Sequence, residues 1–139
     1  MASTTLETAL LALTAALDAA TAVEVLRNAD RPERVGPAGL VVLSDGSQAE
    51  MEVSLSPLRY HVVHQAQVIV VAQDEATRDA ILADIAAALV ADRTLSGAVE
   101  WLEIGPVDLD LADFGDAEAL RAALLPVDMH YTTLGSPAG

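Results

Sequence analysis

The sequence predicts an α+β fold, a single domain in which a mixed, mostly antiparallel sheet carries two main helices packed on one face. Three observations predict it: the longest strand pattern runs from Leu58 to Gln73, residues 4–20 and 74–92 have the spacing of amphipathic helices, and shorter strand patterns lie on both sides of these segments. A chain of 139 residues is long enough for one real core. We assign residues 1–133 to this domain and residues 134–139, rich in Gly, Ser and Pro, to a disordered C-terminal tail.

The long strand pattern has one clearly apolar face. Side chains alternate between the two faces of a strand, so every second residue shares a face. The predicted core face consists of Tyr60, Val62, His64, Ala66, Val68 and Val70. The last four residues, 68–71, are apolar on both faces, as expected for a strand that is covered on both sides.

The two predicted helices have recognisable starts. Thr4 followed by Glu7 is a capping-box pattern, and leucines then recur at helical spacing as far as Leu17. Asp74 caps the second helix, whose predicted apolar stripe is Ile81, Leu82, Ile85 and Leu89. Arg78 is predicted to lie off this stripe, with the acidic residues of the helix.

The remaining segments predict short strands and turns. Residues 22–27 alternate and predict a strand, which is followed by a loop at residues 28–38. Residues 40–43 and 50–55 flank Asp45-Gly46, which predicts a hairpin because both turn residues tolerate positive φ. Residues 99–104 and 125–132 predict two further strands near the C-terminus.

The charge and composition exclude several classes of protein. The net charge is −14 and all seven basic side chains are arginines, which argues against a protein that wraps nucleic acid but allows a duplex to pass without sticking. There is no cysteine, so neither a disulfide framework nor a thiolate metal site is possible. The longest helical apolar run, residues 9–17, is too short to cross a bilayer, so we expect no membrane partner.

Candidate catalytic and metal-binding residues form no convincing pattern. His61 and His64 are three residues apart on a strand and point to opposite faces, and His64, on the apolar face, is expected to be a core histidine. Asp108 and Asp110 resemble the start of a calcium loop, but the required glycine is absent. We therefore expect no catalytic residue, no metal and no cofactor.

Three of the seven arginines, Arg27, Arg31 and Arg34, lie in or beside the loop at residues 28–38. Two interpretations remain open: a solvated loop that orders only on a partner, or a contact with carboxylates of a neighbouring acidic subunit. Copies of a chain with a charge of −14 repel one another, and a guanidinium can bind a carboxylate at two points. We predict that these arginines lie at a subunit boundary.

The order of predicted elements resembles that of the tail terminator family of long-tailed bacteriophages, the lambda minor tail protein U type, which is also found in gene transfer agents. The similar segments are the strand at residues 23–27 with its polar loop, the strand at residues 60–71 that leads into the helix at residues 74–92, and the closing strand at residues 125–133. The resemblance extends to about residue 133 and rests on patterns, not on signature residues.

This resemblance implies a structural protein without enzyme activity. It implies a homo-oligomer, a ring of six subunits that caps the tail tube, stops its polymerisation and joins it to the head–tail connector or stopper protein. DNA would pass through the ring without specific binding. The protein would be assembled in the host cytoplasm and belong to the tail of a virion or gene transfer agent particle. The alternatives are another ring-forming tail or connector component, or a small-molecule-binding or enzyme domain with a site at the sheet edge.

Overall fold

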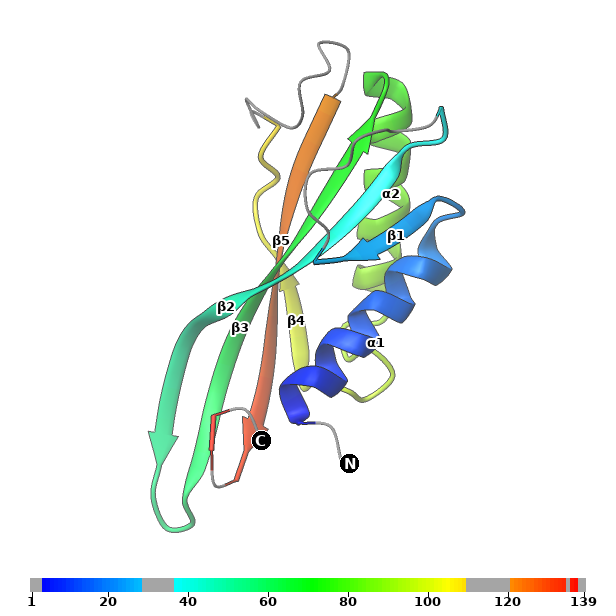
Figure 1. The fold of residues 1–139 in the computed structure, drawn as a ribbon. Coiled ribbons are helices and arrows are strands. Elements are labelled where there is room, and N and C mark those ends of the chain that lie inside the picture. The colour runs from blue at the N-terminus through cyan, green and yellow to red at the C-terminus, as the bar shows by residue number, and fades with distance from the viewer. Residues whose placement is uncertain (1–3, 29–36, 110–120, 135, 138–139) are drawn as a thin grey trace.

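The computed structural model describes residues 4–28, 37–109, 121–134 and 136–137. Its elements are α1 (Thr5–Ala20), β1 (Glu24–Arg27), β2 (Leu40–Ser54), β3 (Arg59–Ala72), α2 (Glu75–Ala91), β4 (Trp101–Ile104) and β5 (Arg121–Thr133). The strands form one sheet in the order β1-β2-β3-β5-β4, in which β1 is parallel to β2 and all other neighbours are antiparallel. Both helices lie on the same face of this sheet (Figure 1), so the predicted α+β class and layer arrangement are confirmed.

Each helix begins with the cap that the sequence predicts. The Thr4 hydroxyl accepts a hydrogen bond from the Glu7 amide at 3.0 Å, and Asp74 Oδ1 accepts one from the Thr77 amide at 2.7 Å. These bonds satisfy amides in the first turn that have no partner within the helix. The second half of the predicted capping box is not formed, because the Glu7 carboxylate binds Arg27 instead.

The main core lies between the helices and the sheet. Alternate residues of β3 from Val62 to Val70 are buried on the helix-side face, and His64 among them is only 4% exposed, as predicted for a core histidine. The buried residues of α2 are Ile81, Ile85, Leu89 and also Arg78. The prediction that Arg78 lies off the buried stripe was wrong: its side chain packs inward and its guanidinium binds the Asp79 carboxylate at 3.0 Å.

The predicted hairpin at Asp45-Gly46 was also wrong, because these residues form a bulge within one continuous strand, β2. Ser44 pairs with Gln67 and Ser47 with Gln65, so two residues of β2 face one residue of β3. Gly46 has φ +70°, and a Cβ there would lie 1.8 Å from the Gln65 carbonyl oxygen. The glycine is therefore needed for close backbone approach and not for a turn.

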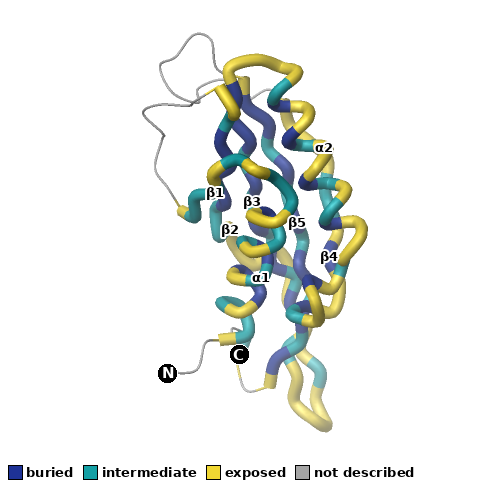
Figure 2. The backbone as a smooth tube through the Cα atoms, turned by 90° about the vertical axis from the view of Figure 1, so that its right-hand side faces the viewer, coloured by how far each residue is buried: buried dark blue, intermediate teal, exposed yellow. Residues whose placement is uncertain are grey.

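The true hairpin joins β2 to β3 through residues 55–58 and projects beyond the helices. We call residues 50–63 the distal hairpin. The apolar side chains of Met51 and Val53 lie on the helix-side face of the sheet there, opposite Val62 and Tyr60 of β3. No described helix covers them, and Figure 2 shows this end of the molecule as largely exposed.

The end of the described chain lies against the sheet. The Pro137 carbonyl accepts hydrogen bonds from Gln48 at 3.3 Å and from Tyr131 at 3.4 Å, so this part of the predicted tail lies against the sheet. Residues 135 and 138–139 lie outside the described residues.

Among the described helices, none is long and apolar enough to cross a membrane.

We expect Ile85→Ala to lower the free energy of unfolding by about 2–5 kcal/mol, because it removes a fully buried side chain between α2 and the sheet. Urea unfolding followed by circular dichroism measures this change. Val90→Ala on the same helix is the matched control, since Val90 is half exposed and its truncation should change stability by less than about 0.5 kcal/mol. Equal effects of the two substitutions would contradict this packing.

Candidate functional site

Arg27, the first of the arginines expected at a subunit boundary, is bound within its own chain. Its guanidinium donates to Glu7 Oε2 and Oε1 at 2.8 and 2.7 Å, and to Asp45 Oδ1 and Oδ2 at 2.8 and 3.0 Å. The network ties α1 to β1 and to the bulge of β2. Four of the five guanidinium N–H groups of Arg27 are thus donated to carboxylates of its own chain. Whether Arg27 also lies at a subunit boundary stays a prediction.

The electrostatics of this network follow from its geometry. The hydrogen bonds from Arg27 lower the pKa of Glu7, and together with a smaller contribution from Asn28 they lower the pKa of Asp45. The same two carboxylates, Glu7 first, raise the pKa of Arg27. The bulge at Gly46 is what aims Asp45 at the guanidinium, because an extra residue re-directs the side chain beside it.

Arg31 and Arg34 lie outside the described residues, so their predicted place at a subunit boundary stays a prediction. Three other described arginines also have carboxylate partners: Arg78 with Asp79, Arg93 with Glu103 and Arg121 with Glu75. Arg59 differs from them, because it makes no ion pair with any described residue. It is exposed and lies on the distal hairpin, directly after the turn.

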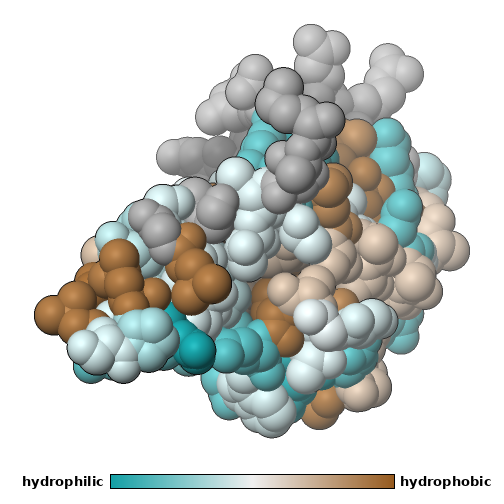
Figure 3. Space-filling model, turned by 90° about the horizontal axis from the view of Figure 1, so that it is seen from below, coloured by the Kyte–Doolittle hydropathy of each residue, from teal (hydrophilic) through white to brown (hydrophobic). Residues whose placement is uncertain are grey.

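Four exposed apolar side chains of the described chain lie on the distal hairpin. Leu55 is 77% exposed, and Met51, Val53 and Leu58 are between 43% and 48% exposed. Figure 3 shows this end of the molecule as a lobe with a strongly hydrophobic surface. A contiguous apolar surface of this kind marks an interaction site more often than isolated exposed leucines do.

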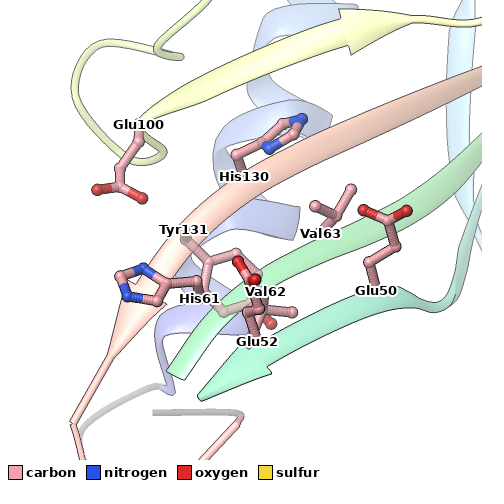
Figure 4. Close-up of a pocket in the computed structure, with 8 residues that line it drawn as sticks. All are labelled: Glu50, Glu52, His61, Val62, Val63, Glu100, His130 and Tyr131. Atoms are coloured by element: carbon pink, nitrogen blue, oxygen red, sulfur yellow. The ribbon is translucent and has the colours of Figure 1, made fainter. Parts of the chain in front are cut away.

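The opposite, open face of the distal sheet is polar (Figure 4). A groove of about 730 Å³ lies there, and its polar lining consists of Glu50, Glu52, His61, Glu100 and His130. Among the described residues, no group of three or more side chains is arranged to hold a metal ion. The groove is open to water, so the carboxylates in it are solvated.

One chain of hydrogen bonds crosses this open face. Ser54 Oγ lies 3.2 Å from His61 Nε2, and His61 Nδ1 lies 3.1 Å from Thr132 Oγ1. The Thr132 hydroxyl donates to Glu100 Oε1 at 2.8 Å. Because the Thr132 hydroxyl donates its hydrogen to Glu100, it acts as the acceptor toward His61, and we assign the ring hydrogen of His61 to Nδ1. His61 Nε2 is then the acceptor for the Ser54 hydroxyl. A histidine in this tautomer can act as a general base toward a serine.

Sequence reasoning missed this chain of hydrogen bonds because it placed the hairpin turn at the wrong site. With the turn at residues 55–58, Ser54 and His61 fall near each other on neighbouring strands. The signal that could have located the turn is Pro57, which lies two residues beyond the alternating pattern at residues 50–55 and cannot donate to a strand ladder.

The comparisons with known proteins identify no family. No protein-family model matches the sequence, and no curated protein is significantly similar to it. What the protein does must therefore be argued from its own surfaces.

We expect Arg27→Met to destabilise the fold more at pH 7 than at pH 3. Folding lowers the pKa of both Glu7 and Asp45, so their contribution is present above the unfolded pKa values of about 4 and is lost as the pH falls through the lower, folded values. Urea unfolding at both pH values measures the difference between wild type and variant. Arg59→Met is the matched control, and at a concentration where the chain is monomeric its effect should be small and independent of pH.

Proposed function

We propose that this protein is a structural subunit of a phage-like tail, a tail terminator that forms a ring on the end of the tail tube. In this proposal it is part of the tail of a virion or gene transfer agent particle. The ring stops polymerisation of the tube protein and presents a surface to the head–tail connector or stopper. It acts by binding its neighbours and not by catalysis.

The observation that carries the proposal is the uncovered apolar surface of the distal hairpin. Met51 and Val53 continue a face that is buried under helices elsewhere in the sheet, and the exposed Leu55 follows in the turn. An acidic chain that repels its own copies has few ways to assemble, and an uncharged apolar surface is one of them. A protein that works by assembly requires such a surface on its folded subunit.

The order of the elements also supports the proposal. The described parts of the segments that resemble the tail terminator family are present as elements: β1, β3 leading directly into α2, and the closing strand β5. The resemblance concerns the arrangement of elements, and it does not identify particular contact residues.

The net charge fits a ring through which DNA passes. A charge of −14 per chain repels the phosphate backbone, so a duplex in the opening would not bind the wall. Four of the five described arginines are neutralised by carboxylates of the same chain, which leaves little basic surface for phosphate in the described part of the protein.

We expect native mass spectrometry of the purified protein to show a closed oligomer of six chains, and negative-stain microscopy to show a ring with an open centre. Assembly should fall with dilution, as mass action requires of any reversible oligomer. A protein that stays monomeric at every concentration, both alone and with purified tails, would contradict the proposal.

The other ring-forming tail components are separated from a terminator by their effect on tube growth. A terminator added to polymerising tube protein should shorten the tubes in proportion to its concentration. A tube protein would itself form long tubes, and a connector would leave tube length unchanged.

An enzyme is the second candidate, and the hydrogen bonds from Ser54 through His61 and Thr132 to Glu100 are the observation that favours it. We expect no activity from them, because Ser54 lies on an open, solvated hairpin where water competes for every charge that develops. Hydrolysis of p-nitrophenyl acetate measures this. The rate should equal that of Ser54→Ala, and a rate that depends on Ser54 would favour the enzyme.

A further inference from the structure

We propose that the distal hairpin of one subunit docks into an apolar groove on a second copy of this chain, between α1 and the turn at residues 92–96. This inference rests on the proposed ring and names the two surfaces that meet in it. The hairpin end and the groove lie on different parts of the molecule. The contact is therefore head-to-tail, the kind that closes into a ring when the rotation between subunits permits.

The hairpin side of the contact is an uncovered extension of the core face. Upstream, the same face of β2 contributes Val41 and Leu43 to the core, under the helices. Beyond the two bulges, Met51 and Val53 have returned to this face, because two extra residues in β2 restore the alternation. Leu55 extends the apolar surface into the turn. Burying these side chains would remove substantial apolar surface from water.

The receiving side is a groove of about 370 Å³ on the outer surface of α1. It is lined by Ala12, Ala15, Ala16, Ala19, Asp92, Leu95 and Ser96. The four alanines leave room for larger side chains, and Leu95 forms an apolar floor that is only 4% exposed. A shallow groove of small side chains is complementary in shape to the bulky, projecting side chains of the hairpin.

Charge identifies the occupant as another copy of this chain. Among the described arginines, Arg59 alone lacks a carboxylate partner, and it follows Leu58 at the tip of the hairpin. The only charged side chain that lines the groove is Asp92, which is exposed. A hairpin seated among the alanines brings an arginine to the rim that carries an aspartate, and such a pair would give the contact its orientation.

The absence of cysteine from the sequence makes the contact directly measurable by disulfide cross-linking. We expect Leu55→Cys and Ala15→Cys proteins, mixed at micromolar concentration under mild oxidation, to form a mixed disulfide. Two thiols held in one contact have an effective concentration in the millimolar range, so the bond should form at least ~10-fold faster than in a control mixture. The control pairs Leu55→Cys with Ala80→Cys, an exposed alanine on the other helix.

A variant of the charged pair tests the orientation. Arg59→Glu in the Leu55→Cys chain should slow the mixed disulfide several-fold, because it places two carboxylates together, whereas Arg59→Lys should keep most of the rate. Equal rates for the two variants would overturn the pairing of Arg59 with Asp92.

The outcomes separate this contact from the proposed function. A six-membered ring in native mass spectrometry whose cysteines cross-link no faster than the control would overturn the contact and leave the ring in place. Rapid disulfides between two Leu55→Cys chains would show a contact between two hairpins instead. A protein with neither ring nor cross-link would contradict both proposals.

Discussion

The structure depends on a mismatch of length between its strands and its helices. The 14 residues of β3 span roughly 46 Å, whereas the 16 residues of α1 span roughly 24 Å, because a strand rises about twice as far per residue as a helix does. Because α1 and α2 pack against each other and are not arranged end to end, they leave one end of the helix-side face uncovered. One part of that face becomes the core, and the other, at the distal hairpin, remains apolar and exposed.

The bulge at Asp45-Gly46 connects these two parts. It keeps β2 continuous past the end of the core, turns Asp45 toward Arg27, and with the second irregularity near Ala49 it restores the alternation that places Met51 on the apolar face. A single residue, Gly46, makes this possible because its backbone approaches Gln65 more closely than any side chain would allow. The same local geometry thus positions an internal ion pair and the exposed surface through which we propose that subunits assemble.

The sequence predicted those features that depend on short-range signals. The caps at Thr4 and Asp74 and the alternation along β3 each act within a few residues, and they located both helices and the central strand. Asp45-Gly46 misled because a glycine with positive φ serves a bulge as well as a turn. The partner of Arg27 could not be predicted either, since Glu7 and Asp45 are separated from it by about twenty residues and meet it only in the folded chain.

The central claim is that the exposed apolar end of the sheet is a contact between subunits. Hydrogen–deuterium exchange, compared between dilute monomer and assembled ring, tests it most directly. We predict slower exchange on assembly at residues 51–59 and in the α1 segment at residues 12–19, because the first inserts against the second. Unchanged exchange at residues 51–59, with protection confined to other surfaces of an assembled ring, would contradict the account.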